Sequence, residues 1–145
     1  EFTFEFGKPF GRPEEIRDKF ISGEADTVLL REPEASQALY AAGDQARVSL
    51  AFSDLWQKIH PDLGNLPNAG VLFKGEFIRK YPELAEVFME ELETAIAWVN
   101  AHPKEAAAQA FEIMAQPRGA VELFLKRVNY NHRNVEDEDV QRKIT

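Results

Sequence analysis

The sequence of 145 residues predicts an α/β chain with a helix-rich C-terminal portion. Two observations predict it. Up to residue 73, short apolar runs rich in branched side chains alternate with amphipathic stretches and are separated by Gly and Pro. From residue 82 onward, apolar residues recur at spacings of three and four, as they do along helices. With 44% hydrophobic and 29% charged residues, the chain has the composition of a globular domain with a core of its own.

The first predicted element is a strand in which Phe2, Phe4 and Phe6 share one face. A strand with three phenylalanines on one face needs partner strands, and none precedes it in this sequence. The sequence also begins without an initiator methionine or a signal peptide. We therefore expect a processed or truncated piece of a longer protein.

A helix and a buried strand follow, and then a second helix. Pro13 and the two glutamates after it suit the first turn of a helix, and Gly23 suits its C-terminal cap. Residues 25–30 form a short apolar run that is typical of a buried strand. Pro33 then opens a helix that we expect to continue to Ala42.

Two more strands are predicted before the helical part. Residues 47–52 alternate apolar and polar side chains, and Ser53 is placed to cap a short helix that ends near Ile59. The segment 60–68 holds two prolines and a glycine and is predicted to be a loop. Residues 70–73 then form another apolar run of strand type.

The remaining chain is predicted to be helical. Pro82 begins a long helix, Pro103 begins a second, and residues 119–128 carry the apolar spacing of a third. Asn134, followed three residues later by an aspartate, is similar to a capping arrangement for a terminal helix.

Charge and cysteine content exclude several classes of function. The formal net charge is −8, from 17 basic and 25 acidic residues, and the isoelectric point is near 4.9. Such a chain is not expected to bind nucleic acid or an anionic membrane surface through basic patches. Without cysteine there is no disulfide framework and no thiol nucleophile.

No catalytic or metal-binding pattern is found in the sequence. His60, His102 and His132 are far apart and lack the spacing of metal ligands. The serines lack the Gly-x-Ser-x-Gly turn of a nucleophile, and the acidic run 90–93 falls on the polar face of the long helix. The chain is therefore expected to be no enzyme and to need no cofactor.

One segment stands out as a candidate binding site. Arg31, Glu32 and Pro33 come directly after a predicted buried strand, and ligands of open α/β sheets collect at the carboxyl ends of strands. Asn68 and Gly70, in the turn before the last predicted strand, are the next candidates. Two alternatives remain open. Arg31, Glu32 and Pro33 could simply begin a solvated helix, and Asn68 and Gly70 could lie in an ordinary turn.

Three stretches resemble a known family. Residues 23–33, Gly-Glu-Ala-Asp-Thr-Val-Leu-Leu-Arg-Glu-Pro, resemble a Gly-x-x-Asp-Ala-hydrophobic-Glu-Pro segment. It is typical of ABC-importer substrate-binding proteins of the nitrate, sulfonate, taurine and thiamine-precursor group. Residues 77–84 and 95–107 are similar to the C-terminal helices of that group, in the same order. Thr27 stands where the group more often has alanine.

The resemblance implies a partial two-lobed fold of the periplasmic-binding-protein type, with this chain as its C-terminal half. Residues 1–32 would finish the second lobe with a crossover strand, and residues 33–145 would return into the helix-rich first lobe. It also implies a small-molecule ligand held in a cleft between the lobes and delivered to an ABC permease of the inner membrane. The location implied is the periplasm, or an anchored position outside the cytoplasmic membrane.

The resemblance carries ligand contacts over to Arg31, Glu32 and Pro33, and with less support to Asn68 and Gly70. Glu32 would accept hydrogen bonds from a cationic or amide-bearing ligand, whereas Arg31 would neutralise an anion such as a sulfonate. Because both signs of charge meet there, the sequence does not choose between these ligands.

Three other functions are compatible with parts of the sequence. Some thiamine-pyrimidine synthases resemble the same fold, but they depend on a cysteine-rich segment that is absent here. The effector-sensing domain of a transcription regulator is a second alternative, and a helical interaction domain without a ligand is the third. If a lobe is incomplete, the apolar faces of residues 2–6 and 71–73 lack partners, and we expect a homodimer or a segment-exchanged assembly that covers them.

Overall fold

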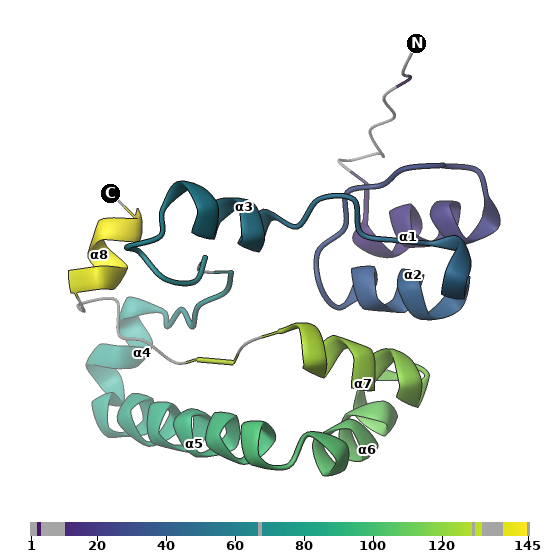
Figure 1. The fold of residues 1–145 in the computed structure, drawn as a ribbon. Helices are drawn as coiled ribbons and strands as arrows, with labels where there is room; N and C mark the ends of the chain where they lie inside the picture. The colour runs from purple at the N-terminus through teal and green to yellow at the C-terminus, as the bar shows by residue number, and fades with distance from the viewer. Residues whose placement is uncertain (1–2, 4–10, 67, 129, 132–137, 145) are drawn as a thin grey trace. The chain divides into compact units, whose positions relative to one another are not determined.

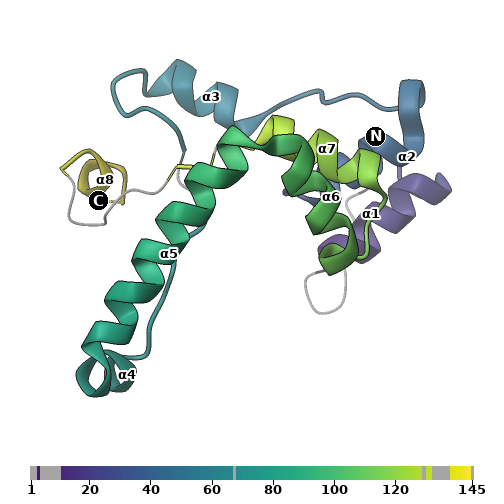
Figure 2. The same ribbon diagram turned by 90° about the horizontal axis from the view of Figure 1, so that it is seen from below.

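The computed structural model describes residues 3, 11–66, 68–128, 130–131 and 138–144, and this part of the chain is all-α. It is 66% helical and contains no strand within those residues. Figures 1 and 2 show the helices from two directions. They are α1 (Pro13–Ser22), α2 (Glu34–Ala42), the 3-10 helix η1 (Gly43–Gln45), α3 (Phe52–Ile59), α4 (Gly75–Lys80), α5 (Pro82–Ala101), α6 (Pro103–Met114), α7 (Arg118–Arg127) and α8 (Glu138–Ile144).

The predicted α/β fold is therefore wrong, and with it the partial two-lobed fold of the binding-protein type. Strands were predicted at 25–30, 47–52 and 70–73. The segments 25–30, 47–51 and 70–73 are irregular, Phe52 begins α3, and Leu72 is 96% exposed. A strand is stable only when its backbone groups pair with a neighbouring strand. Alternating apolar and polar side chains give a strand an apolar face, but they do not provide the neighbouring strand with which its backbone must pair. The strand predicted around residues 2–6 lies outside the described residues.

The helices start and end largely where the sequence predicted. Pro13 occupies the first turn of α1, and Gly23 follows its last residue with a left-handed φ of 79°, which suits glycine. Helices α5 and α6 begin at Pro82 and Pro103 as predicted. The predicted cap at Ser53 is wrong, because α3 already begins at Phe52. The cap predicted at Asn134 falls outside the described residues.

The chain divides into two compact units, which are described separately. Unit 1 contains residues 1–47 and 102–129, and unit 2 contains residues 48–101 and 130–145. Each unit therefore combines two stretches that are separated in the sequence. The predicted division into residues 1–32 and 33–145 referred to the lobes of a larger fold, and it stays a prediction.

Unit 1 is a cluster of four helices with a core of small side chains. Helix α2 packs against both α1 and α7, and α7 also packs against α6. Small residues at the contacts let helix axes approach closely. The buried apolar residues of the described chain all belong to this unit: Ala38, Ala106, Ala107, Ala120 and Val121.

Gly119 of α7 lies directly against the side chain of Tyr40 of α2. A Cβ atom added at Gly119 would lie 2.9 Å from Cζ of Tyr40 and would also clash with its Cε2. We expect Gly119→Ala to lower the free energy of unfolding by about 1 kcal/mol, because overpacking outweighs the gain in helix propensity. In a Tyr40→Ala background the same change is expected to stabilise the protein, since only the propensity gain remains. Urea unfolding, followed by circular dichroism, is measured for the wild type, the two single variants and the double variant. It shows whether Gly119→Ala raises or lowers the free energy of unfolding in each background. Destabilisation in both backgrounds would contradict the close approach.

Unit 2 is held by aromatic contacts and a few polar ones. The ring of Phe73 lies 5.8 Å from that of Phe77 and 5.5 Å from that of Phe88 (centroid distances), which ties the segment before α4 to α5. Asp62 and Arg142 of α8 form an ion pair of 2.7 Å. Much apolar surface stays exposed on this unit. The exposed large apolar residues of its helices are Phe52, Leu55, Ile59, Ile78, Leu84, Val87, Phe88 and Trp98.

Among the described helices, none combines the length and the apolar character that crossing a bilayer requires.

Candidate functional site

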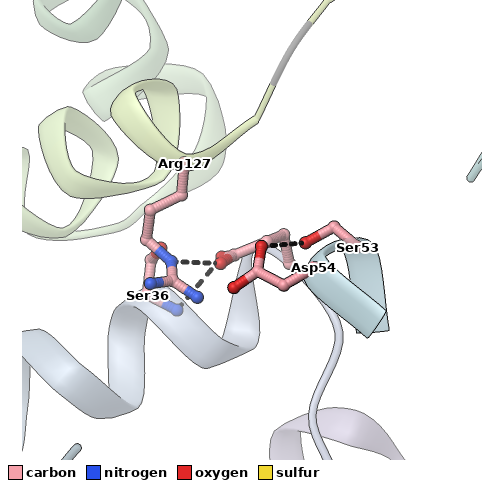
Figure 3. Close-up of polar contacts among 5 residues, drawn as sticks. Ser36, Ser53, Asp54 and Arg127 are labelled. Atoms are coloured by element: carbon pink, nitrogen blue, oxygen red, sulfur yellow. Dashed lines mark hydrogen bonds and ion pairs between the residues drawn. The ribbon is translucent and has the colours of Figure 1, made fainter. Parts of the chain in front are cut away.

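The carboxylate of Glu32, a predicted site residue, joins the start of α2 to the end of α7. Its Oε2 accepts a hydrogen bond from the backbone N–H of Ser36 at 3.1 Å, and its Oε1 accepts one from Nε of Arg127 at 2.6 Å. Figure 3 shows Arg127 and Ser36 converging on this one carboxylate. Glu32 thus binds two groups that lie in different helices of unit 1.

Both contacts follow from the chemistry of helix ends. The first N–H groups of a helix have no partner within it, and the carboxylate of Glu32 satisfies the one at Ser36. Arg127 is the last residue of α7, where a cation suits the negative end of the helix dipole. The side chains of Glu32 and Arg127 are 16% and 33% exposed, so their ion pair is partly shielded from solvent. We expect it to contribute more to stability than a surface pair does.

The first turn of α2 also holds buried polar atoms that lack a hydrogen-bond partner among the described residues. Glu34 is 6% exposed and Ser36 is 0% exposed. Within the described part of the chain, neither Oε2 of Glu34 nor Oγ of Ser36 makes a hydrogen bond. Nε of Arg31 lies 3.7 Å from Oε2 of Glu34, which is an ion-pair distance but too long for a hydrogen bond. The neighbouring buried Gln37 does have a partner, since it accepts a hydrogen bond from Arg17.

The predicted site residues fall into two groups. Arg31, Glu32 and Pro33 lie together in unit 1, with Arg31 exposed and the other two half-buried. Asn68 and Gly70 belong to unit 2 and are exposed on irregular backbone. Their proposed contacts with a ligand stay predictions.

Sequence reasoning missed three residues of this region. Arg127 lies 95 positions after Glu32, and no spacing rule connects them. Glu34 was not considered, because an acidic residue at a helix start is usually exposed. Ser36 was weighed only with the other serines as a nucleophile, because a serine three residues after a proline gives no signal of burial.

Two grooves lie elsewhere, both in unit 2. The first has a volume of about 250 Å³ and is apolar, and His60 at its edge lies 4.6 Å from the ring of Trp56. The second has a volume of about 390 Å³ and includes Tyr130, whose pKa is raised because burial disfavours the charged phenolate. No predicted site residue lines either groove. The first is lined by Phe52, Leu55, Trp56, Ile59, His60 and Leu66, and the second by Glu93, Ile96, Ala97, Asn100, Tyr130 and Asn131.

The described residues include no group of three or more side chains arranged to hold a metal ion. The polar cluster at the start of α2 contains carboxylates, guanidinium groups and a hydroxyl. It has the groups for binding a small polar molecule through hydrogen bonds and charge.

Comparisons with family models, with curated proteins and with solved structures found no match for this chain.

Proposed function

We propose that the chain is the solute-binding component of an ABC importer, and that it binds a small polar molecule at the start of α2 without catalysing a reaction. The observation that carries the proposal is that two buried side-chain oxygens, Oε2 of Glu34 and Oγ of Ser36, make no hydrogen bond within the described part of the chain. They lie directly after Arg31, Glu32 and Pro33, the segment that resembles importer binding proteins.

A buried polar atom without a hydrogen bond is costly, so in a native structure it calls for an explanation. A ligand that brings the missing partner removes this cost when it binds. Binding to the native state alone then stabilises the protein. A domain whose only role is to pack helices against a partner has no need of such atoms.

The proposal implies a permease of the inner membrane as the partner that receives the ligand. It also implies a location in the periplasm or anchored outside the cytoplasmic membrane. Both follow from the sequence resemblance alone. Transfer requires two states of the binding protein that differ in affinity for the ligand, because a ligand shifts an equilibrium only by that difference.

A ligand-independent interaction domain is the second candidate function, and one observation favours it. Helix α3 exposes Phe52, Leu55 and Ile59 on one side, with Trp56 beside them in the apolar groove. Such an apolar face is typical of a helix that packs against another protein or a second copy of the chain.

Thermal unfolding of the full chain with candidate ligands distinguishes the two. We expect taurine, ethanesulfonate, nitrate or a pyrimidine to raise the melting temperature of the wild type. At a concentration one hundred times the dissociation constant, the expected stabilisation is about 2.7 kcal/mol. The shift should be reduced in Glu34→Gln and unchanged in Glu83→Gln, which alters an exposed first-turn glutamate of α5.

The contradicting result is specific. No shift with any of these compounds, together with self-association that Leu55→Asp abolishes in sedimentation, would replace the solute-binding proposal by the interaction domain.

A further inference from the structure

We infer that one side of α5 binds an amphipathic helix of a partner protein, and that this helix carries lysine or arginine beside its apolar residues. The surface lies in unit 2, goes beyond the proposed function and does not depend on a ligand at the start of α2. It is called the α5 face and is defined by five exposed residues: Leu84, Val87, Phe88, Glu91 and Trp98.

The α5 face is an apolar stripe along the longest of the described helices (Figure 2). Leu84, Glu91 and Trp98 follow one another at intervals of seven residues, which is nearly two helical turns, so they lie almost on one line. Val87 and Phe88 lie between the first two of them, and both are, like Leu84, half exposed or more. At about 1.5 Å per residue, the stripe spans about 21 Å.

This stripe is separate from the side of α5 that is half-buried. The half-buried residues follow a different line along the helix: Ala85, Met89, Leu92, Ile96 and Val99. Helix α5 therefore has a second apolar side that is open to solvent. Apolar anchors at spacings of three, four and seven residues are the pattern by which one helix packs along another. The shape of the α5 face thus suits a helical partner.

The charge of α5 is entirely negative, which specifies the charge of the partner. Its 20 residues contain five glutamates and no lysine or arginine. Glu90 follows Val87 by three residues and so flanks the stripe, whereas Glu91 lies within it. Both are exposed, and neither forms an ion pair within the described residues. The basic residues nearest in the sequence, Arg79 and Lys80, belong to α4. A cation on the partner would pair with these carboxylates without displacing another group.

A second copy of the chain fits this face poorly. Glu91 is the tenth of the 20 residues of α5, so two fully overlapping copies bring their Glu91 side chains close together, whether the helices run parallel or antiparallel. Like charges facing each other between two helices are destabilising. The net charge of −8 on each chain adds to the repulsion. A lysine or arginine at that level would instead pair with Glu91 and fix the register of the two helices.

Three synthetic peptides test the inference on the full chain by fluorescence anisotropy. The first is an amphipathic helix of about three heptads, with leucine along one side and lysine on its flanks. The second has glutamate in place of lysine, and the third has the residues of the first in scrambled order. At about 0.15 M salt, we expect the first to bind about tenfold or more tightly than either of the others. Its helix content should rise on binding, as circular dichroism would show.

Two substitutions locate the contact on α5. Glu91→Lys should weaken binding of the basic peptide about tenfold or more, because a cation then faces the lysines of the peptide. Leu84→Asp should weaken it as well, because it places a charge in the apolar stripe. Glu112→Lys is the matched control, since Glu112 is exposed on α6 in unit 1 and the substitution changes the net charge equally. It should change the affinity by about twofold or less.

The other outcomes overturn the inference. Equal binding of the scrambled peptide would show attraction by charge alone, and equal binding of the acidic peptide would show apolar contact alone. Equal weakening by Glu91→Lys and Glu112→Lys would remove the site from α5, and so would no binding of any peptide. Self-association of the wild type that Leu84→Asp abolishes in sedimentation would assign the α5 face to a second copy. Both substituted residues are exposed, so if one variant does not fold by circular dichroism, the other supplies the test.

Discussion

Replacement of Arg127 with methionine is expected to lower the free energy of unfolding by about 2 kcal/mol. The substitution leaves the carboxylate of Glu32 half-buried without its cation, while the apolar stem of the side chain is kept. Removing one partner of a shielded pair costs more than the pair contributed, because the remaining charge stays desolvated. Urea unfolding followed by circular dichroism measures the loss. Hydrogen exchange should show faster opening at the start of α2 and the end of α7.

A matched control lies on the same helix. Arg118 pairs with Glu122 at 3.1 Å, but these side chains are 59% and 40% exposed. Arg118→Met is therefore expected to change the stability by about 0.5 kcal/mol or less. Equal losses in the two variants would show that the Glu32–Arg127 pair is no stronger than a surface pair. A double-mutant cycle with Glu32→Gln should give a coupling energy of about 1 kcal/mol or more.

Replacement of Glu34 with methionine is expected to raise the free energy of unfolding by about 1 kcal/mol. The change removes an acceptor that has no hydrogen bond and fills its place with an apolar side chain of similar length and good helix propensity. It also removes a weak ion pair with Arg31 and a favourable charge at the helix start, so the net gain is smaller than the cost of the unpartnered atom. Chemical denaturation without ligand is the measurement.

Glu83→Met is the control, because Glu83 is exposed in the first turn of α5 and its loss should be neutral or slightly destabilising. A clear loss of stability in Glu34→Met would show that the carboxylate is satisfied within the folded protein, for instance by a buried water. A gain in stability together with a reduced ligand-induced shift of the melting temperature is the trade expected of a residue kept for function.

The local features of this fold were predictable, and the non-local ones were not. Pro13, Pro82 and Pro103 set helix starts because their φ is fixed, and Gly23 set an end because it accepts positive φ. Both effects act within a few residues. The segments 25–30 and 70–73 depend on partner strands, which a single sequence does not display.

In the candidate site, too, the local features were predictable from the sequence and the non-local ones were not. Arg31, Glu32 and Pro33 were found because an apolar run ended in charges. Arg127 reaches Glu32 only through the packing of α7 on α2, and the burial of Glu34 also depends on that packing. Burial of a polar residue at a helix start has no local pattern, since the same residue types occur there when solvated.

Because unit 1 is assembled from two separated stretches of chain, a break in the polypeptide between them would not dismantle it. Leu72 offers a protease an accessible apolar side chain on irregular backbone, in the stretch that lies between the two parts of the unit. The two fragments would still be joined by alanine-rich helix packing and by the contact of Glu32 with Arg127. The two fragments of a cleaved chain would then stay associated under native conditions and separate only in denaturant.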